Sequence, residues 1–359
     1  LVGEDGAIDA YQFFPAVIRS HARLTYTEVA AVLANTRGPE AQRRADLLPH
    51  LLHLHEVYRA LLKQRAKRGA VDFDTVETQI VCDEQGRIER IVPRVRTEAH
   101  KLIEESMLAA NVCAADFIAT AKHPSLYRVH EGPTPEKRVA LQSYLRALGL
   151  GLHVSDEPTP AEMQAISQAT QDRPDAAQIH TMLLRSMQQA IYTATNSGHF
   201  GLAYDAYTHF TSPIRRYPDL LVHRVIKALL GGKRYHLLPS EHTRAPEVRR
   251  GGRTVVQRSA KPLSQEAALW ESTGAHCSAN ERRADEASRD VEAWLKCRYM
   301  REHLGEHLNL LQSLGGAVNA TTWFDRTNYF ETLPVGALDL ALWMEADRLA
   351  TLPAHLDDA

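Results

Sequence analysis

Residues 198–224 read GHFGLAYDAYTHFTSPIRRYPDLLVHR, and this stretch decides how we interpret the rest of the chain. Its aromatic, apolar first part, residues 200–210, predicts a strand and a tight loop. Ser212 then suits the N-cap of a helix and Pro213 its first position, because the N–H that proline lacks has no partner at a helix start anyway. We therefore expect a helix that begins at Pro213 and carries two adjacent arginines in its first turns.

The two arginines, Arg215 and Arg216, predict an anion site. A helix N-terminus presents free N–H groups and the positive end of the helix dipole, so guanidinium groups added there bind phosphate strongly. The alternative is a capped surface helix whose two arginines are simply solvated.

The overall charge offers no support for a nucleic-acid partner. The chain has 359 residues and a formal net charge of −2, and its pI is near 6.9. Its 44% hydrophobic content is enough for the core of a globular protein. Because no global basic field exists, an RNA site in this chain has to be a local channel.

The cysteines and the N-terminus predict a cytoplasmic protein. The four cysteines are scattered singly, which indicates reduced thiols without a disulfide partner; they are Cys82, Cys113, Cys277 and Cys297. The N-terminus lacks a basic region followed by an apolar run, and no window of about 18 apolar residues occurs. We therefore expect neither export nor a membrane span. The first residue is Leu1 and no start of a domain is recognisable there, so we expect the chain to begin inside a domain.

Hydrophobic periodicity predicts a chain that is mostly helical. We expect one strand at residues 11–20 and a hairpin within residues 71–95, joined by Asp83-Glu84-Gln85-Gly86. Residues 231–265 are polar, basic and rich in glycine and proline, which predicts a loop. Helices are expected from Thr25 or Thr27, and at residues 39–68, 97–121, 135–148, 159–172, 174–193 and 264–302.

The string HFTSPIRRYPDL resembles the signature of the ribonuclease II/ribonuclease R (RNB) family. Further blocks resemble the same family in the same order, among them SHARLTYTEVAAVL, IEESMLAANVCAA, YRVHEGP and HCSANERRADEASRDVEAWLKC, and together they cover about residues 1–305. The resemblance implies a partial RNB catalytic domain of α+β class, mainly helical, with helices packed on a small mixed β-sheet. It also implies a monomeric, magnesium-dependent exoribonuclease that hydrolyses single-stranded RNA from its 3′ end to 5′-mononucleotides.

The resemblance assigns roles to five residues. Tyr26 and Glu104 match residues that hold the terminal nucleotide, and Phe73 matches the aromatic residue on which the terminal base stacks. Arg215 matches the arginine that contacts the scissile phosphate, while Arg216 is expected to be structural or to contact a backbone phosphate. Tyr26, Glu104 and Arg215 are thus the expected catalytic residues. The alternatives are helix-surface polar residues for Tyr26 and Glu104, and a core residue for Phe73.

One departure from the family pattern concerns the metal. The family binds Mg²⁺ through aspartates spaced D-x5-D-x-D-D, and this chain has no such spacing. In the family that cluster lies upstream of the blocks matched here. We therefore expect no metal ligands in these residues and no activity from this chain alone.

The C-terminal stretch, about residues 305–352, resembles another family, the insulinase/pitrilysin-type zinc metallopeptidases. The stretch GGAVNATTWFDRTNYF carries the resemblance and implies a strand. His303, Glu306 and His307 fit the HxxEH pattern of those peptidases, and we interpret this fit as accidental because the letters straddle the junction. Residues 306–359 are expected to be a strand-helix fragment fused to the first part, without forming an independent domain.

Three functions therefore remain open on the sequence alone. The first is an exoribonuclease fragment. The second is a non-catalytic remnant that binds RNA 3′ ends, and the third is a zinc metallopeptidase fragment.

Overall fold

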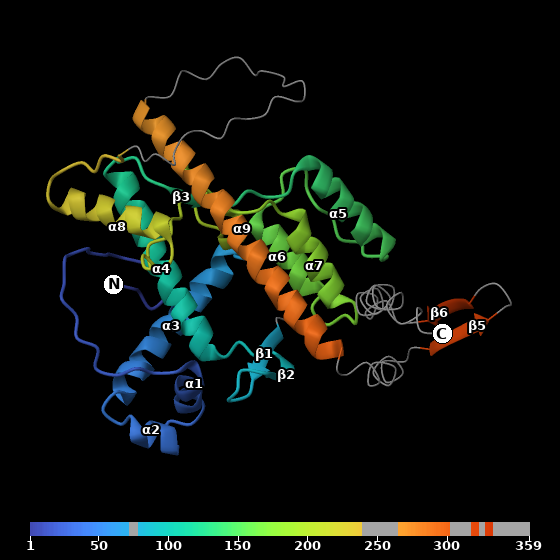
Figure 1. The fold of residues 1–359 in the computed structure, drawn as a ribbon. Helices are drawn as coiled ribbons and strands as arrows, with labels where there is room; N and C mark the ends of the chain where they lie inside the picture. Colours follow the sequence, from blue (N-terminus) through green and yellow to red (C-terminus); the bar gives the residue numbers. More distant parts are fainter. Residues whose placement is uncertain (72–77, 239–264, 302–316, 323–326, 333–359) are drawn as a thin grey trace, which may run out of the picture. The chain divides into compact units, whose positions relative to one another are not determined.

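A computed structural model of the chain describes residues 1–71, 78–238, 265–301, 317–322 and 327–332 (Figure 1). The described part is mostly helical, as expected for an α+β chain. Its strands form three antiparallel pairs, so the expectation of one small mixed sheet is wrong. Within the described residues, no helix is long and apolar enough to cross a lipid bilayer.

The described residues contain helices, short strands and one 3-10 turn, η1 (Phe200–Leu202). The strands are β1 (Thr78–Cys82), β2 (Ile88–Pro93), β3 (Tyr127–Val129), β4 (Ile191–Thr193), β5 (Ala317–Thr322) and β6 (Thr327–Thr332). The helices are α1 (Tyr26–Ala34), α2 (Pro39–Arg43), α3 (Leu48–Arg68), α4 (Glu98–Thr120), α5 (Pro135–Ala147), α6 (Pro160–Ala169), α7 (Ala176–Ser186), α8 (Tyr217–Leu230) and α9 (Gln265–Arg301).

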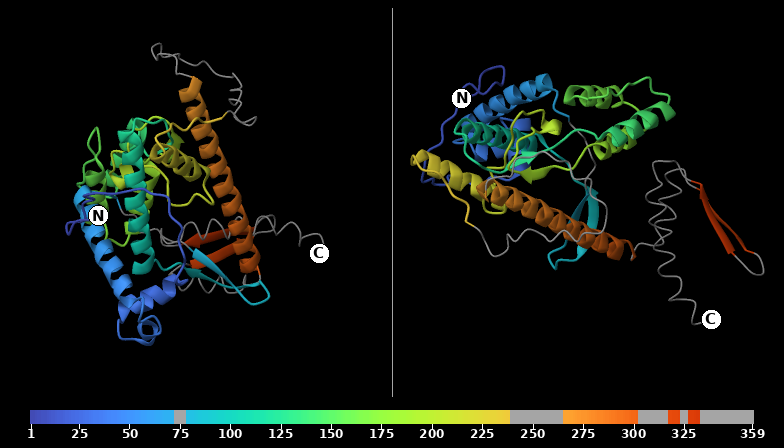
Figure 2. Two further views of the ribbon diagram at one scale, coloured as in Figure 1. Left: turned by 90° about the vertical axis from the view of Figure 1, so that its left-hand side faces the viewer. Right: turned by 90° about the horizontal axis from the view of Figure 1, so that it is seen from above.

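The chain divides into two compact units, and the candidate site lies in the first. The first unit comprises residues 1–75, 94–172 and 179–284, and its described part contains α1 to α6, most of α7, α8 and the first part of α9. Within it, α4 packs against α1, α3 and α8. Figure 2 shows α3 and α4 running side by side in both of its views. Helix α4 is therefore the central element of this unit.

Two clusters of buried apolar side chains form most of the core of the first unit. One gathers around Leu145, Met163 and Leu183 and joins α5, α6 and α7. The other surrounds the fully buried Trp270 of α9 and joins α4, α8 and α9. These clusters fix the helices that carry the candidate site.

Helix starts agree with the sequence analysis where a threonine caps them. Thr25 and Glu28 form a reciprocal capping box at α1, and the Thr25 hydroxyl accepts the Glu28 N–H at 3.2 Å. Thr134 and Thr159 accept the corresponding N–H groups at α5 and α6, each followed by a proline at the first helical position.

The expected strand at residues 11–20 is wrong. These residues have no strand conformation, and Phe14, Val17 and Ile18 are exposed. A strand needs a neighbouring strand for its N–H and C=O groups, and none of the described strands pairs with this segment. Pro15 removes one further donor. Aromatic and β-branched residues alone therefore do not form a strand here.

The expected single helix at residues 39–68 is divided into α2 and α3 by a turn at residues 44–47. Pro49 explains the break, because inside a continuous helix its ring would clash with the carbonyl four residues earlier. In the first turn of α3 it is tolerated.

The expected helix at residues 174–193 also ends early, at Ser186. Residues Ile191–Thr193 instead form β4, which pairs with β3. Three-residue strands are too short to give a recognisable alternation, so the sequence analysis missed both of them.

The second unit includes the hairpin of β1 and β2, where the sequence analysis expected it. Its turn contains Gly86 at φ 78°, a left-handed conformation that glycine adopts without strain. In the same unit, β5 and β6 form an antiparallel pair with Ala317 opposite Thr332. Most of the loop expected at residues 231–265 lies outside the described residues.

We predict that Leu145→Ala lowers the free energy of unfolding by about 2–5 kcal/mol, because Leu145 is fully buried and its loss leaves a cavity. Urea denaturation measures this change. The matched control is Leu184→Ala on α7, whose side chain is 45% exposed, and there we expect a change within about 0.5 kcal/mol. Equal losses in the two variants would contradict the assigned core.

Candidate functional site

The turn that carries the two arginines differs from the sequence prediction. Helix α8 begins at Tyr217 and not at Pro213, and Arg216 occupies the N-cap position. Residues 212–216 form a turn in which the carbonyl of Ser212 accepts the N–H groups of Arg215 and Arg216 at 3.3 and 3.1 Å. Likewise, residues 203–210 do not form a strand. The arginines therefore lie on a loop before the helix.

Asp219 explains why the helix starts late. Its carboxylate is fully buried in the first turn of α8 and accepts the backbone N–H of Ser212 at 2.7 Å. It also accepts the guanidinium of Arg216 at 2.8 Å. A buried carboxylate at a helix N-terminus is stabilised by the dipole as well as by these donors. Asp219 thus fixes the turn before α8, and Ser212 is not the N-cap that the sequence analysis expected, since no side chain caps this helix.

The two arginines consequently have different environments. The Arg216 guanidinium is bound to Asp219 with its side chain 18% exposed, which supports its expected structural role. The Arg215 side chain is exposed, and within the described residues it has no hydrogen bond or ion pair. Arg215 is therefore a solvent-accessible cation on a turn whose backbone is held in place.

Asn111 of α4 fixes the other end of this turn. Its side-chain oxygen accepts the N–H groups of Phe210 and Thr211 at 2.9 and 3.2 Å, and its amide donates to the Tyr207 hydroxyl at 2.8 Å. Asn111 is 2% exposed, and a buried amide in an apolar helix is stable only when such partners exist. Residues 207–219 are thereby tied to α4 and α8.

Tyr26, the first residue of α1, packs against α4. Its ring lies face to face with the imidazole of His100, with 3.9 Å between the ring centroids and 15° between the planes. The backbone N–H of Thr97 donates to Nδ1 of His100 at 3.3 Å, so the proton of the neutral ring is on Nε2. Burial, together with the charges of Arg94 and Arg96, lowers the pKa of His100. Tyr26 remains 46% exposed, so its other face is accessible.

Glu104 lies one turn of α4 beyond His100 and is held by two cations. Arg96 forms an ion pair with its carboxylate, and Nη1 of Arg65 lies 4.0 Å from its Oε1. Arg65 makes a closer pair, 2.7 Å, with the buried Glu105, whose pKa burial raises although the guanidinium opposes the shift. Glu104 is therefore a partly exposed carboxylate that its neighbours keep in one position.

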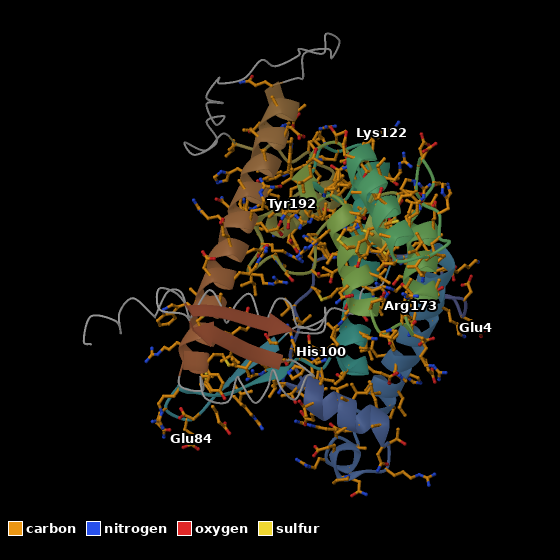
Figure 3. All side chains as sticks on the ribbon, turned by 90° about the vertical axis from the view of Figure 1, so that its right-hand side faces the viewer. Glu4, Glu84, His100, Lys122, Arg173 and Tyr192 are labelled. Carbon is orange, nitrogen blue, oxygen red and sulfur yellow. The ribbon has the colours of Figure 1, made fainter. Side chains whose placement is uncertain are left out.

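The structure brings two of the predicted residues, Tyr26 and Glu104, close together. Tyr26 and Glu104 lie at one end of α4, near His100, which Figure 3 labels at the opposite end of the helix from Lys122. Glu104 and Asn111 are seven residues apart, so they face the same side of α4 about 10 Å apart along its axis. No hydrogen bond or ion pair joins Arg215 to Tyr26 or Glu104 in the described chain. Phe73 lies outside the described residues.

His100, Asn111 and His209 are site residues that the sequence analysis missed. Asn111 had a usable signal, since it is one of two polar residues, with Glu105, on the apolar face of a long helix. His100 is four residues before Glu104, which puts both on one helix face. No pattern pointed to His209, whose Nδ1 lies 2.8 Å from the Tyr192 hydroxyl.

Comparison with known proteins identifies the family of this chain. The model of the RNB domain matches residues 1–232, which is more than half of the chain. The chain belongs to the RNB-domain family. It is 42% identical over 320 residues to ribonuclease R of Vibrio cholerae, a match that covers 86% of this chain and 35% of the relative. The match to ribonuclease R of Escherichia coli is also 42% identical, over 325 residues, and covers 90% and 37%.

A more distant RNB-domain relative, ribonuclease R of Thermotoga maritima, is 36% identical over 348 residues, covering 92% of this chain and 46% of the relative. The chain thus spans less than half the length of these curated relatives. The solved structure of Mycoplasma genitalium RNase R in complex with ribose-methylated single-stranded RNA matches with a TM-score of 0.64 and 24% identity. That match covers 77% of this chain and 40% of the other, and it supports the fold.

The magnesium ion implied by the family resemblance does not fit the described residues of this RNB-domain chain. Among them, no three or more histidine, cysteine, aspartate or glutamate side chains gather as a metal site would require. The carboxylates near the site are instead engaged by arginines, as Glu104, Glu105 and Asp219 illustrate. We therefore derive no step that passes through a metal ion held by these residues.

His209 gives a pH dependence that can be measured. Burial, reinforced by the charges of Arg216 and Arg128, lowers the pKa of His209 to about 2. In the unfolded chain a histidine titrates near pH 6.5, so below that pH the unfolded state binds a proton that the folded state does not. The stability that the neutral imidazole contributes is therefore present above about pH 6.5 and is lost progressively as the pH falls toward 2.

We predict that His209→Gln flattens the pH dependence of the free energy of unfolding between pH 6 and 4, by up to about 1.4 kcal/mol per pH unit. Urea denaturation of both proteins across this range measures the difference between the slopes, in which all other titrating groups cancel. Parallel curves would show that His209 is protonated equally in the folded and unfolded states.

Proposed function

We propose that this chain is part of a 3′-to-5′ hydrolytic exoribonuclease that releases 5′-mononucleotides from single-stranded RNA. The observation that carries the proposal is the RNB-domain match together with more than 40% identity to ribonuclease R proteins. The geometry supports it, because an exposed, unpaired Arg215 on a fixed turn suits an RNA phosphate. Its electrostatic attraction is local, in keeping with the net charge of −2.

Each site residue has a distinct role in this proposal. Arg215 binds the scissile phosphate and stabilises the charge that develops on it as water attacks phosphorus and the bond to the 3′ oxygen of the preceding nucleotide breaks. Tyr26 and Glu104 orient the terminal ribose, with the phenol donating or accepting hydrogen bonds at its hydroxyls and the carboxylate accepting them. Phe73 stacks on the terminal base, a contact that tolerates any base. Arg216 holds the turn through Asp219.

The ion that activates the water belongs to residues other than those described here. We propose Mg²⁺ in that role, and we propose that this chain alone binds an RNA 3′ end without cleaving it. The protein is proposed to act as a cytoplasmic monomer, which agrees with four cysteines that form no disulfide. A purely RNA-binding remnant is the second candidate function, and turnover in a longer polypeptide separates the two.

The adjacent arginines provide a matched pair of variants. In a polypeptide that includes this chain and hydrolyses RNA, Arg215→Ala should lower kcat by about 10²–10³ while changing the free energy of unfolding by no more than about 0.5 kcal/mol. Arg216→Ala should lower the free energy of unfolding by about 3 kcal/mol, because it leaves the buried Asp219 carboxylate without its cation.

Mononucleotide release from a 3′-hydroxyl single-stranded RNA measures kcat, and urea denaturation measures stability. An unchanged rate in Arg215→Ala would remove Arg215 from the site. Salt-dependent RNA binding without turnover, even in the full-length polypeptide, would favour the RNA-binding remnant.

For residues 305–352 we propose a fused metallopeptidase-like fragment that binds no zinc. The antiparallel pairing of β5 and β6 agrees with the strand expected there. His303, Glu306 and His307 lie outside the described residues. Metal analysis of the purified chain should find far less than one zinc per molecule, whereas one equivalent together with peptide cleavage would favour the metallopeptidase.

A further inference from the structure

His100 contacts Tyr26, and its position on α4 is unusual for a histidine. It is the third residue of the helix, where a capping box normally has a Glu or Gln side chain that reaches back to the N–H of the N-cap. Its Nδ1 fills that place: the Thr97 N–H donates to it at 3.3 Å, and the Thr97 hydroxyl lies 2.8 Å away. Helix α1 has the ordinary arrangement, since Glu28 accepts the Thr25 N–H at 3.3 Å. Capping alone therefore does not require an imidazole at position 100.

The ring of Tyr26 supplies a reason for the imidazole. Tyr26 is 46% exposed, and within the described residues its hydroxyl forms no hydrogen bond. A tyrosine side chain that is free in solvent samples several rotamers, and fixing one of them costs conformational entropy. The stack on His100, with 3.9 Å between the ring centroids, favours one rotamer before any ligand is present. A carboxylate or amide at position 100 could not do this.

The stack also relates Tyr26 to Glu104. His100 and Glu104 are four residues apart on α4 and lie on the same face of the helix. The imidazole therefore sets where the phenol lies relative to the carboxylate. Protonation of the ring would remove the Nδ1 lone pair that Thr97 uses. Burial and the charges of the neighbouring arginines lower the pKa of His100, which favours the neutral ring.

We propose that His100 is a positioning residue that acts through Tyr26. The Nδ1 edge of its ring caps α4, while the face of the ring fixes the phenol, so that Tyr26 and Glu104 reach the terminal ribose together. This assignment rests on the proposed function, because it concerns how the 3′-terminal nucleotide is held. His100 itself contacts no reacting atom.

Two substitutions separate the two uses of the ring. His100→Gln keeps an acceptor for the cap and removes the stack, whereas His100→Phe keeps an aromatic ring and removes the acceptor. In a polypeptide that includes this chain and hydrolyses RNA, His100→Gln should lower kcat/KM by about three- to tenfold with a nearly unchanged melting temperature. His100→Phe should lower the melting temperature and keep kcat/KM within about twofold of the unmodified value.

The control is His53→Gln, which changes an exposed histidine of α3 and should leave kcat/KM unchanged. If kcat/KM instead follows the melting temperature across the two His100 variants, His100 is only a cap and the proposal is overturned. A folded His100→Phe variant that is as slow as His100→Gln would also overturn it, because a ring would then not suffice.

A double-mutant cycle tests whether His100 acts through Tyr26. Tyr26→Ala should lower kcat/KM, and His100→Gln added to it should cause no further loss, because the stack is already absent. An undiminished further loss would show that His100 acts independently of Tyr26 and would overturn the proposal. This cycle does not use His100→Phe, so it decides the question even where that variant does not fold.

Failure of this inference is distinguishable from failure of the proposed function. A polypeptide in which Tyr26→Ala lowers kcat/KM while His100→Gln does not would contradict the inference alone. An unchanged rate in Tyr26→Ala would remove Tyr26 from the site and the inference with it.

Absence of RNA hydrolysis in every version would contradict the exoribonuclease. The same variants are then compared by their Kd for a single-stranded oligoribonucleotide with a 3′ hydroxyl. His100→Gln should raise this Kd by about three- to tenfold, and an equal Kd would overturn the positioning role.

Discussion

The hydrogen bonds from Asn111 and Asp219 to the backbone of residues 210–212 are the interactions on which the candidate site depends. This segment is neither helix nor strand, so its N–H groups have no regular partners, and buried N–H groups without partners are costly. An amide from α4 and a carboxylate from α8 supply them. The exposed guanidinium of Arg215 therefore projects from a backbone held at both ends, so little backbone entropy would be lost if it bound an anion.

Sequence reasoning succeeds where the deciding contact is local in the sequence and fails where it joins distant residues. Threonines followed by apolar spacing located the starts of α1 and α4, and proline and glycine breaks located those of α5 and α6, because both signals depend on neighbours within one turn. The start of α8 was misplaced at Pro213 because the deciding contact joins Ser212 to a residue seven positions later. The expected strand at residues 11–20 failed for a similar reason, since a strand requires a partner that no local pattern specifies.

The candidate site shows the same difference between local contacts, which the sequence indicates, and distant ones, which it does not. Tyr26 and Glu104, which the family resemblance singled out, lie on helices that were predicted, whereas Arg215 lies on a loop where a helix was expected. What the sequence alone did not provide is the set of groups that hold them, such as His100 against Tyr26 and Arg96 against Glu104. The arginines of the described chain also differ in their pairing. Arg65, Arg96, Arg128 and Arg216 are neutralised by nearby carboxylates, whereas Arg215 and Arg68 have no such partner in the described chain.

The stack between Tyr26 and His100 makes the tyrosine a one-sided surface. With an imidazole 3.9 Å from one face of the ring, nothing can intercalate there, and a nucleotide can approach only from the opposite face or along the hydroxyl edge. Any ligand that stacks on Tyr26 is therefore confined to the side of the ring that His100, itself oriented by Thr97, leaves open.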